Sequence, residues 1–338
     1  FGQHHFAGAN TFMLNMLKGH IDTLQLSATP AQFDSTIART ERMLRQHSLL
    51  IETSIPLRTP DTAFIDVKLT NLAGHKFPSG YPSRRAWVQL VVTNSSNDTI
   101  YDNGAVDAQD EIAGQDPLWE PHHDVITAPD QVQVYEMVIG DVNGDTTTVL
   151  ERGMAPLKDN RLAPAGFTVG NVSYDTTQIV GVPASDIDFN HDADGVEGSG
   201  SDVVHYHVAM GGETGLIHIA VKVWYQSAPP RYMKDMFAYS SPEIDLFKGM
   251  YQAADNSPVL VRTDTLSDMS TGIDNVRELG LRIFPNPARG GLLSITGIDA
   301  RVIGITVYDA GGRMVADRVG NEERWSVRLP GTGTYVVV

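Results

Sequence analysis

The chain has 338 residues, with 25 basic and 41 acidic side chains, a formal net charge of −16 and no cysteine. This charge disfavours nucleic acid and anionic membrane surfaces as partners. The lack of cysteine excludes disulfides, a catalytic thiol and covalent haem attachment through C-x-x-C-H within these residues. No apolar run approaches the ~18 residues of a membrane-spanning helix.

Two short antiparallel helices are the first elements that the pattern predicts. Apolar residues recur at helical spacing in residues 8–26, and Thr29-Pro30 is typical of an N-cap followed by the first residue of a second helix. The second helix is expected to carry His47 on its apolar stripe and to include Ile51. Residues 1–55 are therefore predicted to form a helical segment.

After the helices the hydrophobic period changes to that of strands. Runs rich in Val and Ile alternate with Gly, Pro, Asn and Asp clusters, and short helices are expected near residues 229–237 and 241–255. The chain is therefore predicted to be mainly β, with an antiparallel β-sandwich with long loops over residues 56–262. The polar residues 263–278 lack periodicity and are interpreted as a linker.

The last unit, residues 279–338, differs from the rest in charge. It holds seven Arg and five acidic residues, which leaves 18 basic and 36 acidic residues in residues 1–278. Its motifs are an NP pair at Asn286-Pro287, a YDAGGRMV strand-turn-strand and the ending LPGTGTYVVV. This series resembles the C-terminal sorting domain of the type IX secretion system, which exports proteins across the outer membrane of Bacteroidetes-type bacteria.

The resemblance to a sorting domain has three implications. The unit is expected to be a small C-terminal β-sandwich, the type IX secretion machinery is an expected partner, and the protein is expected to be secreted or held at the outer cell surface. Because the chain starts at Phe1 and ends within an expected strand, we also expect it to be a piece of a longer precursor.

Two histidine-bearing segments are candidates for cofactor binding. His75 lies in the loop GHKFPSGYP, which glycines and prolines constrain, between two predicted strands. The opening HHFAGANTFML places His4 and His5 directly before an amphipathic helix. Neutral imidazole is an axial ligand of haem iron. The alternatives are a His75 that only forms local hydrogen bonds, and an N-terminal pair that belongs to a frayed end or a purification remnant.

Both segments belong to a longer series of motifs. It comprises H-x-F-x-G-x-N, matched from His4 to Asn10, and G-H-K-x-P-[ST]-G around His75, followed by MVIGDVNGDTTTVLERG, PLKDNRLAPAGF and DFNHDADGVEGSGSDVVHYHV. Over residues 1–262 this series is similar to the C-terminal region of large secreted multihaem c-type cytochromes. The resemblance implies extracellular or cell-surface electron transfer.

The same resemblance assigns the role of distal haem ligand to His4 and His75. His5, beside His4, and His47, on the apolar stripe of the second helix, are further cofactor-binding candidates. Because the chain has no cysteine, haem c is expected to be attached outside this fragment, on an upstream region or a neighbouring subunit. This region is then expected to supply distal ligands, haem shielding and contacts to a redox partner protein.

An acidic loop at residues 185–202 is a candidate calcium site. Oxygen donors alternate along it and precede Gly195, as suits a hard cation, but position twelve of an EF-type loop is Ser201 in place of Glu. A solvated acidic loop is the alternative. The expected metal ligands are Asp188, Asn190, Asp192, Asp194, Glu197 and Asp202.

Two further histidine groups lack a recognisable ligand set. His205 and His207 share one face of a predicted strand, and PHHD at residues 121–124 lies in a loop. No nucleophile elbow, P-loop or dinucleotide fingerprint is present, so no catalytic residue is assigned. The alternative function is a calcium-stabilised secreted adhesion or carbohydrate-binding module without a redox role. A hydrolase ranks last.

Overall fold

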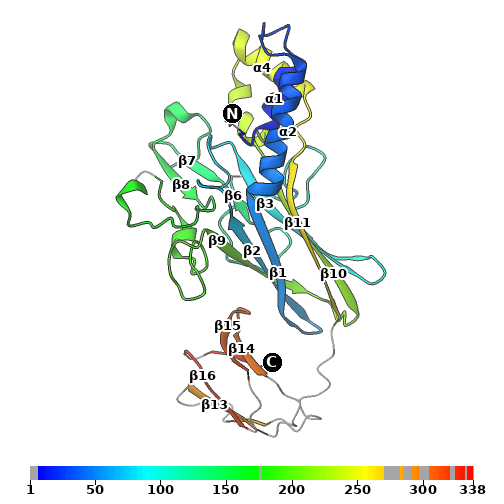
Figure 1. Ribbon diagram of the computed structural model, residues 1–338, viewed down its shortest axis with the longest axis vertical. Helices are drawn as coiled ribbons and strands as arrows, with labels where there is room; N and C mark the ends of the chain where they lie inside the picture. Colours follow the sequence, from blue (N-terminus) through cyan, green and yellow to red (C-terminus); the bar gives the residue numbers. More distant parts are fainter. Residues whose placement is uncertain are drawn as a thin grey trace, which may run out of the picture.

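The computed structural model describes residues 7–116, 118–174, 177–269, 282–284, 291–296, 304–319, 324–331 and 333–337. Within these ranges the chain is mainly β, with several antiparallel sheets and a group of helices at one end (Figure 1). No helix of the described part is both long and apolar enough to cross a membrane.

Helix α1 (Thr11–Gly19) and helix α2 (Pro30–His47) form the predicted helical pair, and α4 (Pro242–Ala253) lies near them in Figure 1. The N-cap prediction is confirmed, because Thr29 and Gln32 form a reciprocal capping box that satisfies free N–H groups at the start of α2. The remaining helical turns are α3 (Pro230–Met233), η1 (Leu150–Arg152), η2 (Val172–Tyr174), η3 (Val182–Ser185) and η4 (Met236–Ala238).

One sheet has the order β1-β2-β9-β5. Its strands are β1 (Leu49–Arg58), β2 (Thr62–Asn71), β9 (Ser201–Ala209) and β5 (Val125–Ile126). The prediction that Ile51 continues the second helix is wrong: α2 ends at His47, and the β-branched residues that follow pair with β2. The sheet is also not wholly antiparallel, because β5 pairs with β9 in parallel.

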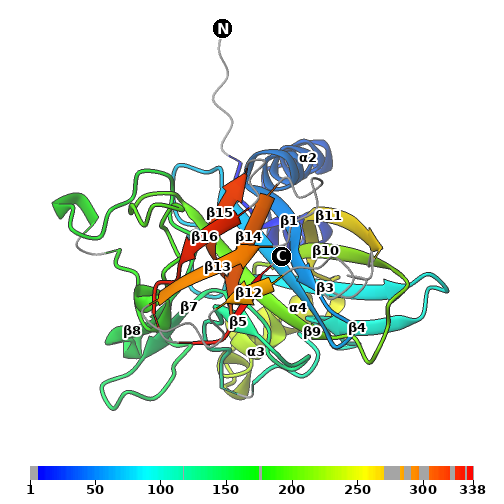
Figure 2. The same ribbon diagram turned by 90° about the horizontal axis from the view of Figure 1, so that it is seen from below.

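A second sheet has the order β11-β10-β3-β4, with β6 also paired to β3 (Figures 1 and 2). Its strands are β3 (Arg85–Asn94), β4 (Thr99–Asn103), β6 (Val134–Tyr135), β10 (Leu216–Gln226) and β11 (Val259–Met269). The expected linker is therefore wrong for residues 263–269, whose polar side chains lie on an edge strand paired to β10. A separate hairpin joins β7 (Met137–Gly140) to β8 (Ala155–Asp159).

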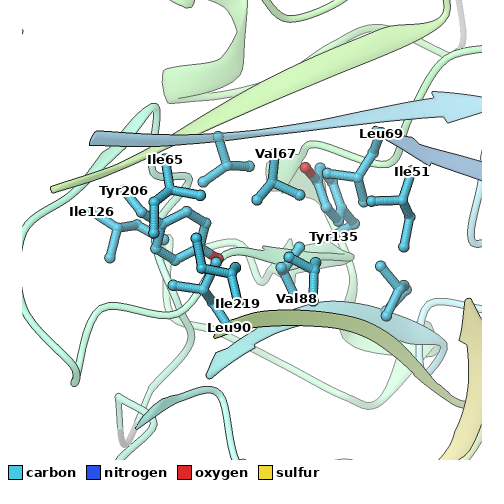
Figure 3. Close-up of a cluster of buried hydrophobic side chains, with 14 of the residues drawn as sticks. Ile51, Ile65, Val67, Leu69, Val88, Leu90, Ile126, Tyr135, Tyr206 and Ile219 are labelled. Carbon is cyan, nitrogen blue, oxygen red and sulfur yellow. The ribbon is translucent and has the colours of Figure 1, made fainter. Parts of the chain in front are cut away.

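These two sheets share one hydrophobic core (Figure 3). Alternate residues of each strand point into it, as the two-residue period of a strand requires. Burying each aliphatic side chain contributes about 1.5–3 kcal/mol, so this core is the main source of stability. Fully buried members from both sheets include Ile65, Val67, Leu69, Val88, Leu90 and Ile219.

The C-terminal part has two three-stranded sheets, β12-β13-β16 and β15-β14-β17. The strands are β12 (Arg282–Phe284), β13 (Leu292–Thr296), β14 (Gly304–Asp309), β15 (Met314–Val319), β16 (Arg324–Arg328) and β17 (Tyr335–Val337). The predicted YDAGGRMV strand-turn-strand is confirmed by the pairing of β14 with β15. The Asn286-Pro287 motif lies outside the described residues.

Candidate functional site

The loop that carries His75 connects β2 to β3 and is held at both ends. Asn71, the last residue of β2, donates from Nδ2 to the His75 carbonyl at 2.7 Å and to the Leu162 carbonyl at 3.0 Å. Its Oδ1 accepts from the Ala73 amide at 2.9 Å. Phe77 and Leu162 exchange two backbone hydrogen bonds. These hydrogen bonds therefore hold the backbone around His75 in one conformation.

The buried side chain of Lys76 also anchors this loop. Its ammonium donates to Asp159 Oδ2 and to the Gln178 carbonyl, each at 2.8 Å, and the side chain is buried. Burial lowers the pKa of Lys76, although Asp159 opposes that shift. Sequence reasoning missed this role because Asp159 lies 83 residues away and no spacing links the two.

The ring of His75 is exposed and its hydrogen bonding selects one tautomer. Nδ1 lies 3.1 Å from the Lys76 carbonyl oxygen, which can only accept, so Nδ1 carries the proton. No described residue forms a hydrogen bond with Nε2. That atom therefore presents a free lone pair, the form in which imidazole binds iron.

A cavity of about 430 Å³ brings predicted cofactor residues together. His47, at the end of α2, and His75 both line it. Ala7 forms part of its wall and lies three residues after His4. His4 and His5 themselves lie outside the described residues. Two of the four histidines expected to bind a cofactor therefore share one pocket, which the start of the described chain also reaches.

Asn10, the last residue of the H-x-F-x-G-x-N motif, is the N-cap of α1. Its Oδ1 accepts from the Met13 amide at 2.9 Å and from Ser227 Oγ at 2.8 Å. Asn10 also lines a second, mostly apolar cavity of about 630 Å³ beside the helices. The apolar residues around that cavity include Met13, Tyr81, Tyr232, Met233, Met236 and Phe247.

The six expected calcium ligands do not form one site. Asn190 is buried and bonds the Phe167 carbonyl and the Gly200 amide. Asp192 accepts from two backbone amides of its own turn, and Glu197 accepts from the Val169 amide. These side chains stabilise the loop itself, and the geometry does not support a calcium site built from the set.

Of the three remaining members of that set, Asp194 is exposed and belongs to neither cluster, whereas Asp188 and Asp202 lie in separate clusters with the histidines that lacked a ligand set. Each cluster draws on the PHHD loop, on residues 186–188 and on β9. Sequence reasoning singled out both histidine motifs but had no signal for their partners, because each group joins three distant segments. The clusters are Asp124 with Asp188 and His205, and His122 with Asp186 and Asp202.

The cluster around His122 is fully buried. His122 Nε2 lies 2.7 Å from Asp186 Oδ2, and Asp202 Oδ2 accepts from the Tyr135 hydroxyl at 2.7 Å. Burial raises the pKa of Asp202 to about 6, with Asp186 adding to the shift and His122 opposing it. The same carboxylate keeps one buried oxygen, Oδ1, without a hydrogen bond among the described residues.

Comparison with known proteins gives a distant structural likeness. No protein-family model and no curated protein matches the chain. It is similar to a penta-heme cytochrome c552 from Thermochromatium tepidum, with a TM-score of 0.39 and 14% identity over 68% of this chain and 41% of that one. It is also similar to HBP35 of Porphyromonas gingivalis, with a TM-score of 0.24 and 9% identity over 92% of this chain and 69% of that one. The chain thus spans less than half of the cytochrome.

Proposed function

We propose that this chain is the part of an exported multihaem c-type cytochrome that ligates and covers haem held by other residues, and that it acts in extracellular or cell-surface electron transfer. One observation carries the proposal: His47 and His75 line the same cavity, and His75 Nε2 forms no hydrogen bond with a described residue. The motif resemblance that selected His75 is independent of this geometry.

The pocket residues fit the role of distal ligand donors. The chain has no cysteine, so any c-type haem bound by these histidines is anchored by residues outside the 338. A donor that reaches such a haem must be exposed, and His75 is exposed while its backbone is fixed by Asn71 and Lys76. Axial ligation by imidazole sets the reduction potential of a bound haem.

Residues beside the ligand pocket have a second role in the proposal. Asn10 fixes the segment that leads from His4 into α1 through its cap and its bond to Ser227. The neighbouring apolar cavity offers methionine and aromatic side chains to a flat apolar group. Such walls exclude water and lower the local dielectric, which also tunes a haem potential.

The C-terminal unit supports export as the second part of the proposal. Its strand-turn-strand and its composition are those expected of a sorting domain that the type IX machinery reads. We therefore place the protein outside the outer membrane, with a redox partner there.

An absorption spectrum of the exported full-length protein tests the proposal. We expect a c-type Soret band, and we expect His75→Ala to convert one haem from low to high spin. His218→Ala is the matched control, because His218 is exposed on β10 and, among the described residues, bonds only Ser267. A product without a c-type Soret band would overturn the proposed function.

A further inference from the structure

His205 stands among three carboxylates on the face of β9 that points away from the core. Asp66 is its direct partner on β2, and Val125 of β5 pairs with it on the other side, which places Asp124 beside the ring. Nδ1 lies 2.7 Å from Asp66 Oδ1, while Nε2 lies 3.0 Å from Asp188 Oδ2 and 3.9 Å from Asp124 Oδ1.

The charge of this cluster is not balanced by its own residues. Three carboxylates face one imidazole, so even a protonated ring leaves the group negative. Asp124 Oδ1 is buried and forms no hydrogen bond within the described residues. A buried, unpartnered carboxylate oxygen beside further carboxylates is costly unless a cation lies near it.

The ring orientation separates this cluster from the one around His122. Gln133 Oε1 accepts from the His123 amide and Asn160 Oδ1 accepts from the Glu136 amide, so both side-chain NH₂ groups point at His122 Nδ1. Nδ1 must accept, and Nε2 therefore carries the proton that it donates to Asp186. A ring in that tautomer cannot bind a cation through Nε2.

His205 has a different arrangement. Its Nδ1 lies beside Asp66 and its Nε2 lies beside Asp188, so without a metal both ring nitrogens donate to carboxylates. A cation bound at Nε2 would take the place of that proton, while Nδ1 keeps its proton on Asp66. A carboxylate that holds the distal ring nitrogen of a metal-binding histidine fixes the tautomer and raises ligand basicity.

We propose that His205 Nε2, Asp188 and Asp124 bind one divalent transition cation of the zinc class, with Asp66 orienting the ring. Zinc accepts imidazole nitrogen and carboxylate oxygen together, whereas calcium takes oxygen ligands. This site is distinct from the expected acidic-loop set, of which only Asp188 takes part. It does not depend on the proposed haem role.

The distances in the cluster agree with one shared ion. Donor atoms that bind zinc at about 2.0–2.2 Å lie at most about 4.4 Å from one another. The observed separations from His205 Nε2, 3.0 and 3.9 Å, fall within that limit. The side chains of Asp124 and Asp188 are 42% and 28% exposed, which leaves an entry path and room for water as a further ligand.

His207, the other histidine of this strand face, does not join the site. Its ring packs edge-on against Phe64, with the two ring centroids 4.7 Å apart, and its Nε2 lies 2.8 Å from the Gly311 carbonyl oxygen. Of the two histidines that share this strand face, only His205 therefore belongs to the site, together with two carboxylates from other segments.

Calorimetric titration of the chelator-treated protein with Zn²⁺ tests the proposal. We expect one ion per chain, a loss of affinity of roughly 100-fold or more in Asp124→Asn and His205→Asn, and a loss of roughly 10–100-fold in Asp66→Asn. Asp194→Asn is the control, because Asp194 is an exposed acid of the neighbouring loop outside the cluster. Ca²⁺ is expected to give no comparable heat.

Two outcomes would overturn the metal site. One is no saturable Zn²⁺ binding at micromolar protein. The other is equal binding by the native chain and by Asp124→Asn, whose partly exposed position lets the variant fold. Cobalt substitution reports the ligand set, because the visible d–d bands of an ion with nitrogen and oxygen ligands should change or disappear in His205→Asn and persist in Asp194→Asn. If Zn²⁺ binds and the haem spectrum does not change, the metal site is independent of the proposed haem role, and a failure of one proposal can be told from a failure of the other.

Discussion

Lys76 and Asp159 form a buried ion pair, with Nζ 2.8 Å from Oδ2, across 83 residues of sequence. Asp159 is in turn held by Arg161, whose Nε and Nη2 each lie 2.8 Å from a carboxylate oxygen. Lys76 thus links the loop to the end of β8, and this ion pair holds the backbone next to the exposed His75 in place.

Replacing Lys76 by Met should destabilise the protein by about 3–5 kcal/mol, because it leaves a buried carboxylate without one of its two cationic partners. Urea unfolding followed by tryptophan fluorescence measures the loss. Lys68→Met on the exposed side of β2 is the control and should stay within about 0.5 kcal/mol of the native chain. Equal stabilities for the two variants would contradict the anchoring role.

Replacing Asn10 by Ala should cost about 1 kcal/mol or more, because α1 loses its N-cap and Ser227 loses a partner. Thermal unfolding gives the difference. Asn15→Ala in the same helix is the matched control, because Asn15 is exposed and, within the described part of the chain, bonds only the Thr11 carbonyl. A larger effect at Asn15 than at Asn10 would refute the capping assignment.

Asp202 should make stability fall as pH rises from about 4 to 7. Its folded pKa is about 6 and lies above the unfolded value of 3.8, so the folded state binds the extra proton between these values. The contribution is complete below 3.8 and is lost as pH passes 6, with an upper size of roughly 3 kcal/mol. His122, Asp186 and Tyr135 are the titratable groups that face it.

Unfolding free energies of the native chain and of Asp202→Asn at pH 4 and pH 7 check that prediction. The variant lacks the ionisable group, so the native chain should lose stability relative to it on going to pH 7. A difference between the two proteins that is independent of pH would show that Asp202 does not titrate in this range.

The tautomer of His122 is a further expectation. Two amide NH₂ groups donate to Nδ1, so long-range ¹H–¹⁵N correlation spectra should show a protonated Nε2 and an unprotonated Nδ1. His75 should show the reverse pattern, because its Nδ1 faces a carbonyl oxygen. Identical patterns for the two rings would contradict the hydrogen-bond assignments.

Local patterns in the sequence predicted the elements whose signals lie within one segment. Thr29-Pro30 predicted the start of α2, and the Val- and Ile-rich runs predicted strands such as β2 and β10. Residues 263–269 of the edge strand β11 lack a recognisable period in the sequence, because only one face of the strand is covered and alternate polar residues hide it.

Sites assembled from distant segments could not be predicted in the same way. His205 was visible on its strand, but Asp66 and Asp124 become its neighbours only through the pairing of β2 and β5 with β9, and Asp188 reaches it from the loop before β9. The alternating acids of residues 188–197 resembled a cation loop, yet Asp192 and Glu197 bond backbone amides. A spacing cannot distinguish a ligand from a turn-capping side chain.

The central claim is that His75 is a distal haem ligand, and one titration tests it directly. A haem c peptide with one histidine ligand and a vacant sixth position is added to the chain, and its Soret band reports spin state. The account predicts conversion to low spin by the native chain and by His218→Ala, and no conversion by His75→Ala. Equal conversion by the native chain and His75→Ala, or a loss confined to His47→Ala, would contradict it.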